Sequence, residues 1–260
     1  MFPAFCFFSC ERHVNAGRAT TIKIGMKKPK PCAGSGALRL LLLGAALMVL
    51  SAVQSNAADV SVKIADKEPP KQIAEFIRKT LQPKAVLLLN GDTPAFEFWF
   101  GSEIPLKSKP ASPDKALDAF QETALLGAVA VGRGQRDYKD NDIAAGVYTM
   151  RFGLQPQDGD HLGTAEYPYF AVLIPAASDT KPDGITTFKA MAKASGKDTS
   201  SNHPIILSLR PTASDSGDLP KLNEPATDHK SVRVKVPAKS GDEKTSVVFE
   251  LVYKGHGHIQ

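Results

Sequence analysis

Apolar side chains occupy every second position in five separate segments, and no other feature constrains the fold of this chain as strongly. The alternating sets are Val60/Val62/Ile64, Phe96/Phe98/Phe100, Tyr148/Met150/Phe152/Leu154, Val232/Val234/Val236 and Val247/Phe249/Leu251/Tyr253. Successive side chains of a β-strand point to opposite faces, so each segment is predicted to be a strand with one buried face. In the third set Arg151 falls on the opposite face. We therefore expect Met150→Asp to unfold the domain and Arg151→Ala to change the free energy of unfolding by at most about 0.5 kcal/mol.

Three further segments are apolar throughout, and together with residues 205–209 they are predicted to be strands that are buried on both faces. The three are residues 85–89, 124–131 and 170–174. Asn90-Gly91 follows the first of them and predicts a hairpin, because a type I′ turn needs two residues with positive φ.

Three segments have helical rather than alternating spacing. Residues 70–81 place Ile73, Phe76, Ile77 and Leu81 on one face, and Pro83 ends the pattern. Ser112-Pro113 predicts the start of a second helix, with Leu117 and Phe120 directed inward. Residues 185–195 carry Phe188, Met191 and Ala192 and are followed by Gly196, a common helix terminator. The pattern as a whole predicts a mainly β protein, an antiparallel β-sandwich or jelly-roll-like domain with about three short helical inserts.

The first 57 residues are predicted to be a leader and not part of the folded domain. Lys27, Lys28 and Lys30 precede an apolar run over 40–53, and Ser55-Asn56-Ala57 supplies small residues before a cleavage site at Ala58. The apolar run is shorter than the ~20 residues that a membrane-spanning helix needs. We therefore interpret 26–57 as a signal peptide, 1–25 as a start site assigned too far upstream, and 58–260 as one β-rich domain with a frayed C-terminal tail. The true start is Met1 or Met26, which the sequence leaves open.

Charge and cysteine content narrow the possible functions of the mature domain. Of the 32 basic and 27 acidic residues, seven basic residues and one acid precede residue 58, so this leader carries +6 and the remainder −1. The basic surplus is therefore no sign of nucleic-acid binding. Cys6, Cys10 and Cys32 also lie in the leader, so the mature domain has neither a disulfide nor a thiolate metal site. We expect a periplasmic or extracellular protein without a membrane span after cleavage.

One stretch resembles an uncharacterised family of exported bacterial proteins. The resemblance is carried by residues 145–152, AGVYTMRF, and by 155–161, QPQDGDH, together with Phe98-Trp99-Phe100, Ile104-Pro105-Leu106-Lys107 and Asn202-His203-Pro204. It covers most of residues 85–210. The resemblance implies a β-rich fold and an exported protein, and it implies no activity.

The strongest candidate for chemistry is the loop that contains Asp158, Asp160 and His161. Two carboxylates and an imidazole can ligate one divalent metal such as zinc or calcium, with His203 or Glu166 completing the set. The alternative is a tight turn in which the charges face water and Gly159 supplies backbone freedom, so that Gly159→Val destabilises the protein. The acids at 137, 140 and 142 lack the glycine and closing glutamate of a calcium loop, so a solvated loop is expected there.

Two other features raise the question of a ligand. Trp99 is the only tryptophan and could stack on a sugar, although packing in the core is the competing interpretation. His256 and His258 lie in a polar tail and could capture a metal.

No complete catalytic constellation is present in the sequence. The leading hypothesis is a non-catalytic binding or structural module of the cell envelope that needs no cofactor, with an envelope carbohydrate or protein as its partner. The alternative is a metal-dependent hydrolase centred on the Asp158–His161 loop.

Overall fold

A computed structural model describes residues 59–137, 141–156, 159, 165–197, 199, 203–213, 217–223 and 229–255. The predicted signal peptide, the residues Asp158, Asp160 and His161, and the tail histidines His256 and His258 lie outside the described residues. The described strands are β1 (Val60–Asp66), β2 (Lys84–Asn90), β3 (Thr93–Phe100), β4 (Ile104–Leu106), β5 (Leu125–Val131), β6 (Gln135–Arg136), β7 (Asp142–Ile143), β8 (Gly146–Leu154), β9 (Tyr169–Pro175), β10 (Ile205–Pro211), β11 (Lys221–Asn223), β12 (Lys230–Ser240) and β13 (Glu243–Lys254).

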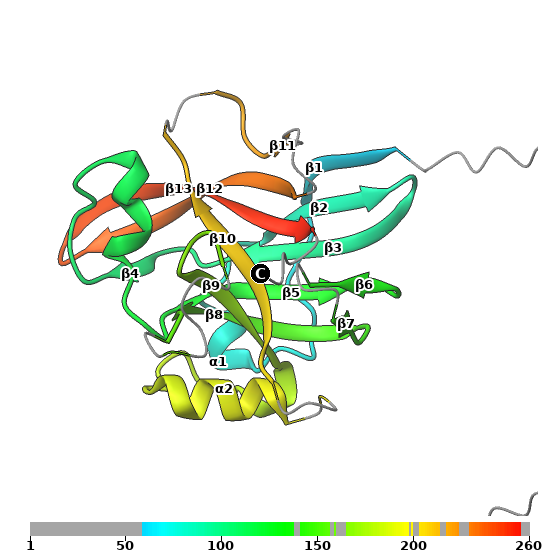
Figure 1. Cartoon of the computed structure of the whole chain (residues 1–260), viewed down its shortest axis with the longest axis horizontal. Coiled ribbons are helices and arrows are strands. Elements are labelled where there is room, and N and C mark those ends of the chain that lie inside the picture. The colour runs from blue at the N-terminus through cyan, green and yellow to red at the C-terminus, as the bar shows by residue number, and fades with distance from the viewer. Residues whose placement is uncertain are drawn as a thin grey trace, which may run out of the picture. The chain divides into compact units, whose positions relative to one another are not determined.

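Eleven of these strands form one continuous sheet in the order β1-β2-β3-β5-β8-β9-β10-β13-β12-β11, with β4 paired to β12. The pairings along this path are antiparallel, and β4 runs parallel to β12. The sheet curls, so that strands from both halves of the order face one another (Figure 1). The prediction of a mainly β, sandwich-like fold is therefore confirmed. Strands β6 and β7 form a separate two-stranded hairpin.

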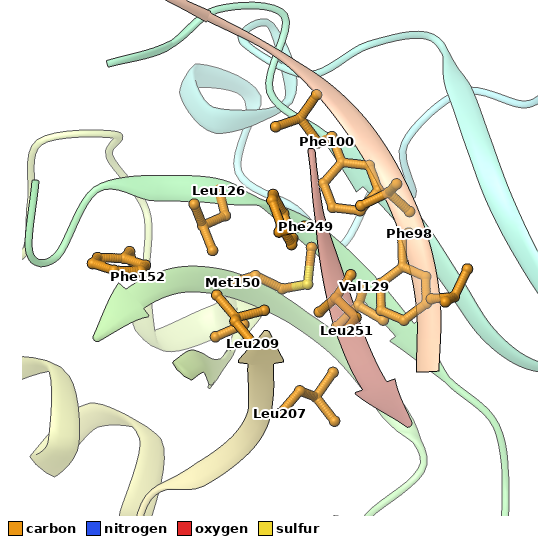
Figure 2. Packing of buried hydrophobic residues seen from close by; sticks show 14 of the residues in the cluster. Phe98, Phe100, Leu126, Val129, Met150, Phe152, Leu207, Leu209, Phe249 and Leu251 are labelled. Carbon is orange, nitrogen blue, oxygen red and sulfur yellow. The ribbon is translucent and has the colours of Figure 1, made fainter. Parts of the chain in front are cut away.

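The alternating apolar faces of the two halves meet in the main core. Phe98 of β3, Val129 of β5 and Met150 of β8 point toward Leu209 of β10 and Phe249 of β13 (Figure 2). The rings of Phe100 and Phe249 meet edge to face with their centroids 6.3 Å apart, so β3 and β13 are in direct contact across the core. Met150 is completely buried, as the alternation predicts.

The outer faces of the central strands are also covered, which explains the runs that are apolar throughout. Residues Ile73, Ile77 and Leu81 pack on the outer face around Trp99. The helix α2 (Phe188–Gly196) packs through Met191 on the outer side of β9 and β10. Figure 1 shows α2 lying beside the sheet next to β8 and β9. Strands β5 and β9 are therefore buried on both sides.

The helical segments occur where the spacing predicts them, with differences in extent. The first is only α1 (Glu75–Arg78), and Phe76 is 70% exposed, so its predicted place on the apolar face is wrong. Ile73, Ile77 and Leu81 follow an i, i+4, i+8 line, and Phe76 points away from it. The second is the 3-10 helix η1 (Pro113–Ala119), with Leu117 and Phe120 buried as expected. A further turn, η2 (Ala176–Ser178), follows β9.

The hairpin after β2 differs from the predicted turn in detail. Asn90 is the last residue of β2 and pairs with Thr93, so the two loop residues are Gly91 and Asp92. Gly91 has φ +58°, while Asp92 is not among the residues with positive φ, which does not fit a type I′ turn. The hairpin itself is confirmed.

The exposed position predicted for Arg151 is wrong, and this is the main difference between the prediction and the structure. The Arg151 side chain is 1% exposed and forms an ion pair with the equally buried Asp179, with Nε 2.7 Å from Oδ2 and Nη2 2.9 Å from Oδ1. The remaining guanidinium N–H groups donate to the carbonyl oxygens of Thr123, Lys181 and Pro182. The register of β8 is as predicted, but the segment after β9 folds over its outer face. A small effect of Arg151→Ala is therefore no longer expected.

None of the helices in the described residues is long and apolar enough to cross a membrane.

Candidate functional site

A pocket of about 460 Å³ lies at one end of the sheet, and we call it the strand-end pocket. Its lining residues are Asp137, Asn141, Asp142, Ile143, Ala144, Gly146, Val147, Tyr148, Pro175, Thr199, His203, Pro204 and Ile205. Neighbouring strands β8, β9 and β10 are antiparallel, with Tyr148 opposite Pro175 and Ile205 opposite Leu173. The start of β8, the end of β9 and the start of β10 therefore meet at the same edge. The β6–β7 hairpin adds a further wall.

Two hydrogen bonds fix the hairpin wall. The carboxylate of Asp137, which is 3% exposed, accepts from the backbone N–H of Asn141 at 2.9 Å and from its side-chain Nδ2 at 2.9 Å. A carboxylate only accepts, so the group facing it must be the NH₂ of the amide, and Oδ1 of Asn141 is left to accept from another partner. The expectation of a solvated loop is therefore wrong for Asp137, which is buried and bonded to Asn141, whereas Asp142 is exposed and Asp140 lies outside the described residues.

The other two walls are also fixed from within the protein. The hydroxyl of Tyr148 donates to the carbonyl oxygen of Ala144 at 2.7 Å and thus ties the β7–β8 connection to β8. The hydroxyl of Thr199 lies 3.0 Å from the carbonyl oxygens of both Gly196 and His203, and it joins the end of α2 to the approach of β10. These bonds preorganise the pocket, which lowers the entropy cost of binding a ligand.

The chemical character of the lining is mixed. Val147, Pro175 and Pro204 provide apolar surface, while Asn141, Thr199 and His203 provide polar groups. Asp142 is paired with Arg136, whose Nε lies 2.9 Å from Oδ1. A mainly apolar surface with a few fixed polar groups is typical of small-molecule sites, and the volume falls in their usual range of roughly 300–1,000 Å³.

Of the five residues named as candidate ligands of a metal at the Asp158–His161 loop, the structure describes His203 and Glu166, and the Glu166 carboxylate is ion-paired with Arg210. His203 is exposed and lines the strand-end pocket, with Nδ1 3.3 Å from the carbonyl oxygen of Pro204. Asp158, Asp160 and His161 lie outside the described residues, so their convergence on His203 stays a prediction. Within the described ranges no group of three or more His, Cys, Asp or Glu side chains is arranged to hold a metal ion.

Gly159 lacks the backbone feature on which its predicted role depends. A Cβ built there would meet nothing within 4 Å, and its φ is outside the range that disfavours other residues. The conformational reason for expecting Gly159→Val to destabilise the protein is therefore absent.

Trp99 is 1% exposed and packs among Ile73, Ile77 and Ala128 on the outer face of the sheet. Its Nε1 donates to the carbonyl oxygen of Lys67 at 2.7 Å, so the polar end of the indole is paired inside the protein. Both faces of the indole are covered by other side chains, so Trp99 packs in the core and offers no surface on which a sugar could stack.

A second polar cluster lies on the outer face of β12 and β13, around Glu250. This carboxylate is 5% exposed and accepts hydrogen bonds from Ser231 at 2.7 Å, from Arg233 at 2.8 Å and from Asn223 at 3.0 Å. Burial raises the pKa of Glu250, but the hydrogen bonds from Ser231, Arg233 and Asn223 outweigh it and hold the pKa below its usual value. Every partner of Glu250 is a fixed protein group, so the cluster holds β11, β12 and β13 together.

Sequence reasoning missed the parts of the strand-end pocket because they are far apart in the chain. Asn141 and Thr199 had no role in the predicted site, and His203 was assigned to a different cluster. The only local signal was the polar spacing of 137–142, which fits a solvated loop equally well.

Compared with known protein families, with curated proteins and with solved structures, the chain matches none. The resemblance to a family of exported bacterial proteins therefore stays a prediction.

Proposed function

We propose that the protein is an exported, non-catalytic binding module of the cell envelope and that it holds a small ligand in the strand-end pocket. The observation that carries this proposal is a pocket of about 460 Å³ whose walls come from separate parts of the chain and are each fixed by internal hydrogen bonds. The predicted signal peptide supports the location, since a leader of this kind directs export.

The hydrogen bonds made by the hydroxyl and carboxylate groups of the pocket support a role in ligand binding rather than in catalysis. A nucleophile needs a base within hydrogen-bond reach, and a general acid or base needs a proton to transfer to a bound substrate. Here the Thr199 hydroxyl is directed at backbone carbonyl oxygens and the Tyr148 hydroxyl at Ala144. The carboxylate of Asp137 is engaged by Asn141. These groups build the walls of the pocket.

The proposal can be tested by filling the pocket with a side chain. Gly146 is exposed and lines the pocket, its φ is ordinary, and a Cβ there would touch only the Tyr148 ring at 3.5 Å. Gly146→Phe should therefore fold normally and block ligands. Ala111→Phe is the control, because Ala111 is exposed and outside the pocket.

The measurement is a screen of a small-molecule fragment library by NMR with the purified protein. We expect saturable shifts centred on residues 141–148, 199 and 203–205, present in Ala111→Phe and lost in Gly146→Phe. If no fragment binds there, or if binding persists in Gly146→Phe, the strand-end pocket is not the binding site.

A further inference from the structure

The charged groups at the strand-end pocket are compensated within the protein. Asp142 is paired with Arg136, and Asp137 is buried against Asn141. The described lining residues include no lysine or arginine that could pair with an anion. Among the described lining residues, an ionic ligand of either sign would lose hydration on entry and would meet no lysine or arginine and only carboxylates that already have a partner, and this combination disfavours its binding.

The uncharged groups of the pocket are suited to a neutral ligand that both donates and accepts hydrogen bonds. The amide of Asn141 is oriented by Asp137 and presents Oδ1 as an acceptor. Across the pocket lie the Thr199 hydroxyl, whose proton is directed at backbone carbonyl oxygens and whose oxygen can accept, and the His203 imidazole, whose ring nitrogens donate or accept according to the tautomer. A ligand with several hydroxyl groups meets these requirements.

The apolar part of the lining fits the same class of ligand. Val147, Pro175 and Pro204 bring C–H groups from three separate segments to the pocket. The ring of a sugar carries C–H groups on its faces and hydroxyls at its edge, so it would use both kinds of surface. Resting on the proposed function, we infer that the strand-end pocket binds an uncharged polyhydroxylated ligand, a neutral sugar or a sugar-like polyol.

The test compares sugars that share one ring configuration and differ in charge through a single substituent. Purified protein is titrated with D-glucose, D-galactose and D-mannose, and with the 2-amino and uronic acid forms of each, while NMR shifts are recorded. We expect at least one neutral sugar to bind saturably at residues 141–148, 199 and 203–205 with a Kd of roughly 0.1–10 mM. Its cationic and anionic forms should bind at least about tenfold more weakly, because their charge finds no partner.

Two variants locate the interaction. Asn141→Ala should weaken binding of the neutral sugar about fivefold, which corresponds to the loss of one hydrogen bond. Asn90→Ala is the matched control, since Asn90 is an exposed asparagine at the β2–β3 hairpin, and it should leave the Kd unchanged. Gly146→Phe should abolish binding and keeps the test informative if Asn141→Ala disturbs the hairpin.

The results separate the ligand class from the proposed function. If a charged form binds as tightly as its neutral parent, the ligand class is wrong although the pocket is a binding site. If fragments bind in the pocket and no neutral sugar does, the ligand class is also wrong. If neither fragments nor sugars bind there, the proposed function fails and this inference fails with it.

Discussion

Replacing Arg151 should lower the free energy of unfolding substantially, although the sequence pattern suggests that apolar packing alone stabilises this part of the sheet. Arg151→Met keeps an unbranched side chain that can fill part of the space and removes the charge and the guanidinium N–H donors. The Asp179 carboxylate, which is 1% exposed, then keeps a hydrogen bond from the Thr149 hydroxyl, 2.7 Å from Oδ2. Removing one partner of a buried ion pair costs about 3–5 kcal/mol, because the other charge is left uncompensated.

This cost is a large share of the total stability. Domains unfold with a free energy of about 5–15 kcal/mol, so Arg151→Met should leave a marginally stable protein. For a domain of about 200 residues each kcal/mol lowers the Tm by about 2–4 °C, which gives a decrease of about 6–20 °C. Urea denaturation followed by circular dichroism measures the free energy, and calorimetry measures the Tm.

Two further variants decide whether the buried charge is the cause. Lys79→Ala removes an exposed ion pair with Glu75 and should cost at most about 1 kcal/mol. The double variant Arg151→Met/Asp179→Leu removes both charges and should be more stable than Arg151→Met alone. If Arg151→Met costs no more than Lys79→Ala, or if the double variant is the less stable of the two, the ion pair does not hold the outer face of β8 as described.

Four further predictions address other parts of the molecule. Gly127→Ala should destabilise the protein strongly in urea denaturation, because a Cβ there would lie 2.2 Å from the carbonyl oxygen of Trp99; a neutral result would contradict the close approach of β3 and β5. The pKa of Glu250 is lower in the folded than in the unfolded protein, so ionised Glu250 stabilises the fold fully above the unfolded pKa, and this stabilisation is lost as the pH falls through the folded pKa. Glu250→Gln should therefore make the Tm fall less steeply below about pH 4.5. Added zinc or calcium should leave the Tm unchanged. A metal bound at the predicted loop would instead stabilise the protein by about 2.7 kcal/mol at a hundredfold excess over its Kd. A rise in Tm that is lost in His161→Ala would favour the hydrolase hypothesis. Mass spectrometry of the exported protein should find an N-terminus near Ala58, and a retained leader would contradict the signal-peptide interpretation.

The sequence by itself determined the longer strands and the inward faces of those that alternate. Phe98, Met150 and Phe249 were each assigned to the buried face of a strand from alternation alone, because the period of a strand and the hydrophobic effect are both local properties of the pattern. The same reasoning located α2 through Met191, and the Asn90-Gly91 pair located the hairpin between β2 and β3. It placed Phe76 wrongly, because a short helix buries a narrower face than the spacing suggests.

Only the tertiary structure decided what covers the outer faces and which distant residues meet. Alternation shows that Arg151 and Met150 lie on opposite faces of β8. It does not show whether another segment folds over the outer face and buries Arg151. The loop that carries Asp179 does so, 28 residues further along the chain. The strand-end pocket arises in the same way: antiparallel pairing of β8, β9 and β10 brings Tyr148, Pro175 and Ile205 to one edge. Sequence spacing does not encode that pairing, since it depends on the free energy of the whole folded sheet.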